Sequence, residues 1–128
     1  MKTILTSIML LAGMIVSFGQ QAFPVGNSSL TNSRTIYAAP LKLFTVSGYN
    51  ASPSLLYVQI FGTVTNATNG ATPLYSLPVN TTNWYSFDFT AVGLNLDACK
   101  VCVSSNATTL TLTPSNTTSI QATIKAPQ

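Results

Sequence analysis

The feature that most restricts the fold is the stretch Asn83–Thr90, in which apolar and polar side chains alternate. A period of two residues is the pattern of a β-strand with one buried face. From Arg34 onward, no window of the chain has the 3.6-residue period of an amphipathic helix. We therefore expect this part of the chain to consist of strands. The apolar side of the stretch comprises Tyr85, Phe87 and Phe89, and the other side Trp84, Ser86 and Asp88.

Short β-type runs recur about every ten residues, separated by clusters of Gly, Pro, Asn and Ser. One run contains Pro78, which has no N–H for a ladder hydrogen bond, so that run is expected at a sheet edge. Ser47–Asn50 is expected to form a turn. The spacing predicts an all-β fold, an antiparallel β-sandwich of about seven or eight short strands, jelly-roll-like or immunoglobulin-like. The expected strands are Thr35–Ala38, Leu41–Val46, Leu55–Phe61, Leu74–Val79, Asn83–Thr90, Ala98–Ser104, Thr109–Thr113 and Ser119–Lys125.

The run Leu55–Gly62 is the densest β-type stretch of the chain and is largely apolar on both faces. Gln59 is the one polar member of its second face. A strand of this kind is expected to be buried on both sides. We expect one side in the core of the sandwich and the other under a neighbouring subunit, with Asn83–Thr90 as its partner strand.

The N-terminal segment has the layout of a secretory signal peptide, because Lys2 is followed by an apolar run that extends to Phe18. The run is shorter than the roughly 20 apolar residues of a membrane span. Cleavage is expected near Gly19, which would make Gln20 the first mature residue. The alternative is a retained hydrophobic segment that plugs into a neighbouring subunit. The expected organisation is residues 1–19 as this segment, 20–33 as a linker or extended arm, and 34–128 as the β-sandwich domain.

Charged residues make up only 5% of the chain, against about 25% in ordinary domains. The polar surface must therefore consist mainly of Thr, Ser, Asn and Gln, which suits contacts between subunits because few charges need desolvation. The five cationic side chains are scattered along the sequence. Binding to nucleic acid requires a basic patch that neutralises several phosphates together, so we expect no nucleic-acid partner.

Catalytic residue types are nearly missing from the sequence. The chain has no His, and its only carboxylates are Asp88 and Asp97. These two are the only candidates for a carboxylate pair of the kind used in glycoside hydrolysis. No loop offers the several oxygen ligands of a calcium site. We expect the protein not to be an enzyme and to use no cofactor and no metal.

Cys99 and Cys102 form a Cys-x-x-Cys pair. A zinc site usually needs four ligands, and the chain has no third Cys and no His. A thioredoxin-type redox pair belongs near a βαβ pattern, which is missing here. Positions three apart in a regular strand point to opposite faces, so a disulfide between them would require a bulge or turn. Two interpretations stay open, a strained local disulfide or two separate residues of which Cys99 belongs to the core.

Aromatic residues are the candidates for a binding or interface surface. Trp84 lies on the side of its strand opposite Tyr85, and we expect it to be buried, in the fold or in a subunit interface. The alternative is an exposed platform on which sugars stack. The candidate aromatics are Tyr49, Tyr57, Trp84 and Tyr85, with Tyr75 as a further member of such a platform.

Asn-x-Ser/Thr sequences would be glycosylation acceptors in a secreted eukaryotic protein. Turn chemistry explains most of them equally well, since Asn favours turns and Thr favours strands. They begin at Asn27, Asn50, Asn66, Asn80, Asn106 and Asn116.

Five motifs follow one another from about residue 41 to the C-terminus: Leu43–Asn50, Tyr57–Phe61, Pro73–Val79, Tyr85–Phe89 with Gly93, and Ser104–Thr113. Their order resembles that in a family of short β-rich proteins encoded by tailed bacteriophages. The resemblance covers roughly 85 residues, in which the motifs keep their order and approximate spacing. It implies a non-enzymatic virion component of the head-decoration or fibre type. The chain departs from the family in its signal-like N-terminus and at Asp97–Lys100, where the family has a Gly-containing turn.

The leading hypothesis is a structural protein of a phage virion surface, which acts by assembling with itself or with other virion subunits. The first alternative is a secreted bacterial adhesion module that binds a glycan or cell surface through Trp84 and neighbouring tyrosines. An extracellular filament or matrix subunit is the second alternative. The expected location is the virion surface or, for the alternatives, the extracellular space.

Overall fold

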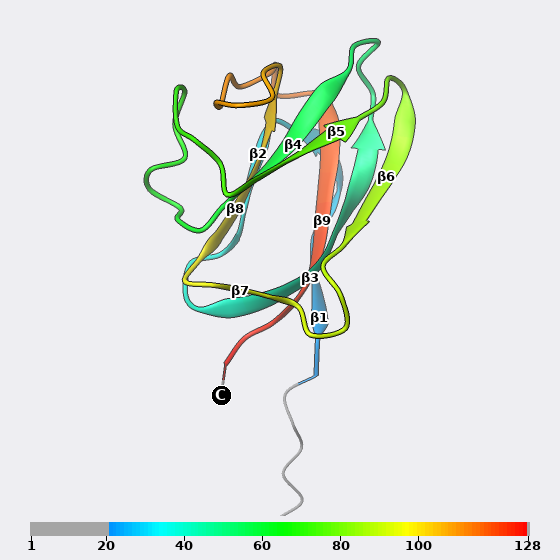
Figure 1. The fold of residues 1–128 in the computed structure, drawn as a ribbon. Coiled ribbons are helices and arrows are strands. Elements are labelled where there is room, and N and C mark those ends of the chain that lie inside the picture. The colour runs from blue at the N-terminus through cyan, green and yellow to red at the C-terminus, as the bar shows by residue number, and fades with distance from the viewer. Residues whose placement is uncertain (1–20, 128) are drawn as a thin grey trace, which may run out of the picture.

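The computed structural model describes residues 21–127, and the expected signal segment and its cleavage position lie outside the described residues. The described chain folds into nine strands in two packed antiparallel sheets (Figure 1). This architecture confirms the predicted all-β antiparallel sandwich. Over residues 21–127, no helix is long and apolar enough to cross a membrane.

The first layer, sheet A, has the strand order β1-β9-β3-β6, and β7 pairs with the first part of β3. The second layer, sheet B, has the order β2-β8-β4-β5. Sheet A consists of β1 (Phe23–Thr31), β3 (Leu41–Asn50), β6 (Asn83–Asp88), β7 (Leu94–Leu96) and β9 (Thr118–Lys125). Sheet B consists of β2 (Ser33–Tyr37), β4 (Leu56–Phe61), β5 (Tyr75–Val79) and β8 (Cys99–Ser104).

The core lies between the facing sides of the two sheets, where the inward-facing side chains of the central strands β3, β9, β4 and β8 are buried. Each fully buried aliphatic side chain stabilises the fold by about 1.5–3 kcal/mol relative to its exposed state. The side chains with no exposed surface include Leu43, Val46, Ile120 and Ile124 from sheet A, and Val58, Ile60, Val101 and Val103 from sheet B.

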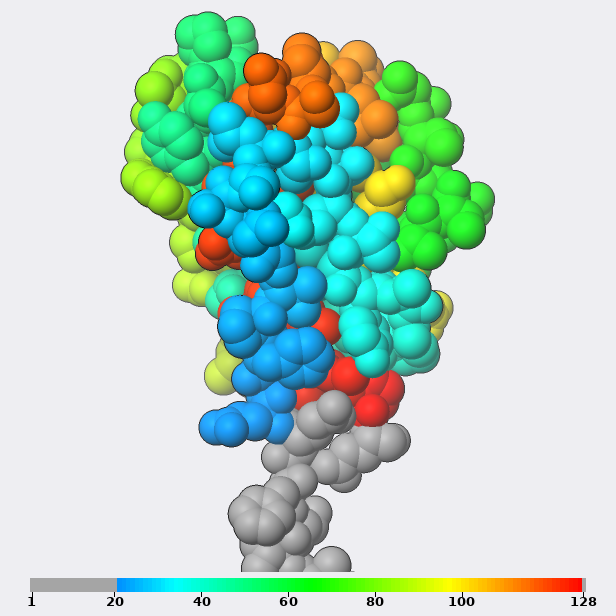
Figure 2. All heavy atoms as spheres, turned by 180° about the vertical axis from the view of Figure 1, so that it is seen from behind, coloured from blue at the N-terminus to red at the C-terminus, as the bar shows by residue number. Residues whose placement is uncertain are grey.

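The expectation of a linker over residues 20–33 is wrong for most of that segment. Phe23–Thr31 is β1, which pairs with β9 from Phe23 opposite Ile124 to Thr31 opposite Thr118. In this strand only Val25 packs against the main core, so the alternating pattern that identifies a strand is weak. Backbone hydrogen bonds to β9 hold the segment instead. Seen from behind, β1 (blue) rises along the molecule beside the segment that contains β2 (cyan) (Figure 2).

The expected turn at Ser47–Asn50 is also wrong, because β3 continues through these residues to Asn50. Gly48 serves here for close packing: a Cβ at this position would lie 1.9 Å from the Ser119 carbonyl oxygen. The glycine allows β3 to pass close to β9. Interpreting Ser-Gly-Tyr-Asn as a turn misses this role of the glycine.

One expected strand pairing is wrong, and the expected edge position of the Pro78 strand is confirmed. β4 pairs with β5 and β8, whereas β6 pairs with β3 in the other sheet, so the expected pairing of Leu55–Gly62 with Asn83–Thr90 is wrong. The run with Pro78 is β5, an edge strand that pairs only with β4, as predicted. The expected strand Thr109–Thr113 is wrong, because within it only Leu112 makes a β-bridge, to Ser104.

Two loops of the chain itself, 62–74 and 105–117, pack over the outer face of sheet B. They bond to each other, because the Gly70 N–H donates to the Leu110 carbonyl and the Leu110 N–H to the Ala71 carbonyl, both at 2.8 Å. Gln59 anchors the second loop from below through its Nε2, which donates to the Asn106 carbonyl at 2.8 Å. A second apolar cluster forms under these loops. It consists of Phe61, Ala67, Cys102 and Leu110.

β4 is therefore buried on both faces, as predicted. The 62–74 and 105–117 loops, rather than a neighbouring subunit, cover its second face. Gln59, the one polar residue of its face, has no exposed surface. Its Nε2 donates to the Asn106 carbonyl of the 105–117 loop, whereas its Oε1 is buried without a hydrogen-bond partner among the described residues.

Candidate functional site

The outer face of sheet A carries exposed and half-exposed side chains in cross-strand rows. In the rows Tyr49 lies opposite Trp84, and Ser47 lies between Ser86 on one side and Gln121 on the other. We call this face the sheet A platform. Its members are Thr45, Ser47 and Tyr49 from β3, Trp84, Ser86 and Asp88 from β6, and Gln121 and Thr123 from β9.

Trp84 is the most exposed large apolar side chain of the described residues, with 75% of its surface open. Its ring centroid lies 5.0 Å from that of Tyr49 with the planes inclined by 52°. The expectation that Trp84 is buried is therefore wrong for the single chain. The reason is alternation on edge strand β6: Tyr85 points into the core, so its neighbour must point out.

The groups around these two rings are small and mostly uncharged. Ser47, Ser86 and Gln121 offer hydroxyl and amide groups that both donate and accept hydrogen bonds. Asp88 is the only carboxylate of the platform and is exposed on β6. An aromatic pair beside a row of hydroxyl and amide groups can stack against an apolar surface while bonding polar groups at its edges.

The other candidate aromatics do not join the platform. Tyr85 is buried, and its hydroxyl donates to the Ser119 carbonyl at 2.7 Å. Burial raises the pKa of Tyr85 above its ordinary value. Tyr57 is half-buried on β4 in sheet B, and Tyr75 lies on β5 against Phe89, at 6.0 Å between ring centroids.

The two carboxylates that sequence analysis considered as a pair occupy different places. Asp88 lies on the platform opposite Thr45, while Asp97 follows β7 and lines a groove described below. Over residues 21–127, no three His, Cys, Asp or Glu side chains come together as a metal site would require.

Alternation placed Ser86 and Asp88 on the side of Trp84, but sequence analysis missed the polar members of the platform that come from β3 and β9. The only hint was the alternation of β9, which places Gln121 and Thr123 opposite the core residues Ile120, Ala122 and Ile124. No pattern in the sequence indicates that β9 lies beside β3, so none could place Gln121 near Ser47.

Both cysteines are free and buried. Cys99 belongs to the main core and Cys102 to the second cluster under the loops, so the two point to opposite faces of β8. Burial, and secondarily the neighbouring Cys102, raises the pKa of Cys99 to about 12. Burial raises the pKa of Cys102 to about 11, although nearby Lys100 acts in the opposite direction.

The thiols should therefore resist alkylation in the folded protein. At pH 8, iodoacetamide is expected to leave both unmodified over a period in which the protein unfolded in guanidinium chloride reacts completely, because only the thiolate attacks. Rapid labelling of the native protein, read by intact mass, would contradict the expected resistance of the thiols.

The raised pKa values of the two thiols also predict that the stability of the protein falls as the pH rises above the ordinary thiol value of 9.0, since only the unfolded chain then ionises.

A scan of the chain against protein-family models, a search of curated proteins and a search of solved structures each gave no match.

Proposed function

We propose that the protein is a non-enzymatic recognition domain that binds a surface saccharide through the sheet A platform. The observation that carries this proposal is the exposure of Trp84, 75% of whose surface is open beside Tyr49. A tryptophan is seldom left so exposed without use, because burying such a ring contributes a large favourable free energy.

The chemistry of the platform favours a saccharide over other ligands. A pyranose ring has apolar C–H faces that stack on aromatic rings and hydroxyl groups around its edge that need both donors and acceptors. Ser47, Ser86 and Gln121 supply such groups, and Asp88 can accept from two sugar hydroxyls. The platform carries one formal charge, so a neutral, hydroxyl-rich ligand suits it better than a strongly charged one.

The location of this domain is proposed from the resemblance to bacteriophage proteins, which favours a virion surface. A secreted form with the same binding face is the alternative. Mass spectrometry of purified particles tests the location: the chain should be present at stoichiometric copy number, with its N-terminal peptide reporting whether residues 1–19 are retained. Its absence from particles would leave the secreted form.

Binding can be read directly from the protein, because Trp84 is its only tryptophan. A glycan array of bacterial surface saccharides should identify a binder, and titration of that oligosaccharide should change the tryptophan fluorescence. Trp84→Ala should weaken array binding about tenfold or more, equivalent to about 1.4 kcal/mol. Tyr75→Ala is the matched control, an exposed aromatic of the other sheet, and should bind normally. A blank array would refute the saccharide proposal.

The second candidate is assembly, in which the same face contacts another subunit. The observation in its favour is that Trp84 lies on β6, an edge strand of sheet A, where a large aromatic side chain can act as an interface anchor. Assembly predicts an oligomer in light scattering that Trp84→Ala converts to monomer. Saccharide recognition predicts no change in mass between the two proteins.

A further inference from the structure

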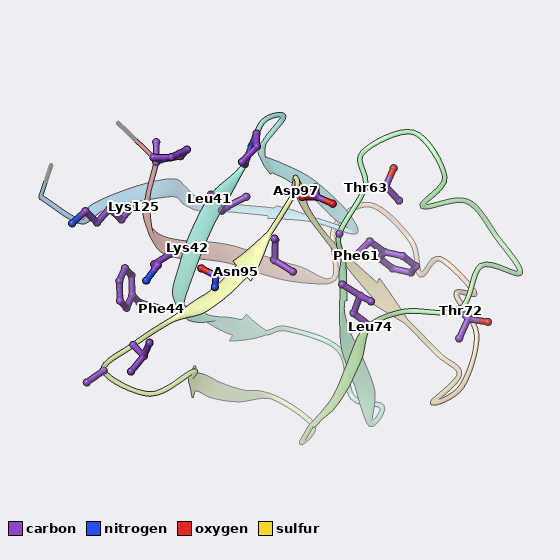
Figure 3. Close-up of a pocket in the computed structure, with 17 residues that line it drawn as sticks. Leu41, Lys42, Phe44, Phe61, Thr63, Thr72, Leu74, Asn95, Asp97 and Lys125 are labelled. Atoms are coloured by element: carbon purple, nitrogen blue, oxygen red, sulfur yellow. The ribbon is translucent and has the colours of Figure 1, made fainter.

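A groove of about 1020 Å³ opens at the end of the sandwich away from the aromatic pair, and nothing in the sequence indicated it. It lies around β7, between the chain leading into β3, the 62–74 loop, the segment after β6 and the last residues before the C-terminus (Figure 3). Its volume is in the range of small-molecule sites.

One end of the groove concentrates positive charge. Lys42 on β3 lies directly opposite Lys125 on β9, and Asn95 on β7 lies opposite Lys42 on the other side. Directly opposed side chains of an antiparallel pair have Cβ atoms about 5 Å apart, and like charges there are mutually destabilising. In a chain with five cationic residues in all, such a pair is best explained by an anion that neutralises it.

Among the described residues that line the groove, Asp97 is the one carboxylate against two lysines, so their side chains carry an excess of one positive charge. Figure 3 shows Asp97 near Phe61 and Thr63, whereas Lys42 and Lys125 lie together at the other end beside Phe44. The carboxylate is therefore poorly placed to neutralise the lysine pair.

The rest of the lining is mainly apolar and includes two unusually exposed aliphatic side chains. Leu74 is 57% exposed and Val92 is 69% exposed. Phe44 lies beside the lysines on one side of β3, whereas Leu74 and Phe61 lie on the other side, where the 62–74 loop begins and ends (Figure 3). Exposed apolar surface that is grouped in a groove marks a binding site more often than scattered single residues do.

We propose that this groove binds an amphiphile with one carboxylate head and an unbranched alkyl tail. The carboxylate lies between the Lys42 and Lys125 ammonium groups and accepts a hydrogen bond from the Asn95 amide. The alkyl tail lies along Phe44 and Val92 and extends past β7 to Leu74. One negative charge matches the excess of one positive charge, and the apolar walls match the tail. The lysine pair lies at the other end of β3 and β9 from Tyr49, in the row that follows Thr45 and Thr123. The amphiphile proposal does not depend on the saccharide proposal.

The probe is dodecanoate, titrated by calorimetry below its micelle-forming concentration. It should bind with a stoichiometry of one, and its affinity should fall as salt is raised. Dodecyltrimethylammonium, with the same tail and the opposite charge, should bind at least about tenfold more weakly. Acetate, with the same head and no tail, should give no measurable heat.

Lys125→Glu is the decisive variant, because it replaces an opposed like-charge pair by an opposite-charge pair and so should not harm folding. It should lower the dodecanoate affinity by about tenfold or more. Leu74→Ser should also lower the dodecanoate affinity, because the serine side chain loses the apolar contact with the alkyl tail. Lys100→Gln, which removes a cation outside the groove, and Trp84→Ala, on the platform, should leave it unchanged. Equal binding of the two charged amphiphiles, no saturable binding, or unchanged affinity in Lys125→Glu would each overturn the proposal.

Discussion

Replacing Gly48 by alanine is expected to destabilise the protein by several kcal/mol, on the order of 3–5. A Cβ at this position would lie 1.9 Å from the Ser119 carbonyl oxygen and 2.6 Å from the Tyr85 hydroxyl. These two atoms are hydrogen-bonded to each other, and the carbonyl belongs to β9 in the middle of sheet A. The methyl group can be accommodated only if β3 separates from β9 or Tyr85 leaves the core.

The sign of the change in stability distinguishes a glycine that close packing requires from a glycine in an unconstrained strand. In an unconstrained strand, Gly→Ala should stabilise by roughly 0.5–1 kcal/mol, because alanine loses less conformational freedom on folding. Urea unfolding followed by tryptophan fluorescence would measure the difference. The control is Ser47→Ala, the neighbouring position that faces outward, for which we expect a change within about 0.5 kcal/mol. A Gly48→Ala protein as stable as the parent would disprove the close approach of β3 to β9.

Asn50→Asp is expected to destabilise the protein by at least about 3 kcal/mol at neutral pH. Asn50 has no exposed surface. Its Nδ2 donates to the carbonyl oxygens of Ser54 at 3.1 Å and Asn80 at 2.9 Å, while its Oδ1 accepts from the Ser52 N–H at 2.9 Å. One side chain thus ties together β3, the turn after it and the turn before β6. A carboxylate would set a buried negative charge against two carbonyl oxygens.

The pH dependence of this variant identifies the cause. Burial beside two carbonyl oxygens, with the Ser52 N–H as the one donor given to the side chain, favours the protonated carboxyl. The penalty should therefore be largest at neutral pH and should diminish as the pH falls, because a protonated carboxyl can donate to one of the carbonyl groups. The parent protein should lack this recovery on acidification. Asn116→Asp is the matched control, since Asn116 is exposed, and its stability should stay close to that of the parent. Equal thermal midpoints for the two variants would contradict the assignment of Asn50.

The same burial has a consequence for the Asn-x-Ser/Thr sequences. Asn50 begins one of them, yet its amide nitrogen is occupied by two backbone carbonyl groups inside the fold. The motif there is explained by turn chemistry, since Oδ1 bonds the N–H two residues on. Sequence alone treats this asparagine like the exposed Asn106 or Asn116, because the motif is identical.

Local pattern was sufficient to predict the fold class and most of the central strands. Alternation in Asn83–Asp88 predicted which side of β6 faces the core, and the apolar density of Leu56–Phe61 predicted that β4 is buried on both sides. Pro78 placed β5 at an edge through its missing N–H. Each of these properties depends on a residue and its immediate neighbours, so a single sequence contains it.

Tertiary structure alone decided the neighbours of each strand, and with them both candidate sites. A period of two residues states which side of a strand is apolar but not which strand lies beside it. The pairings of Tyr49 with Trp84 and of Lys42 with Lys125 therefore depend on how the sheets assemble. β1 was missed for the related reason that its stability comes from pairing with β9 rather than from an apolar face of its own. Sequence determined which side of a regular strand faces the core, and the assembly of the two sheets determined which strands, and so which exposed side chains, lie side by side.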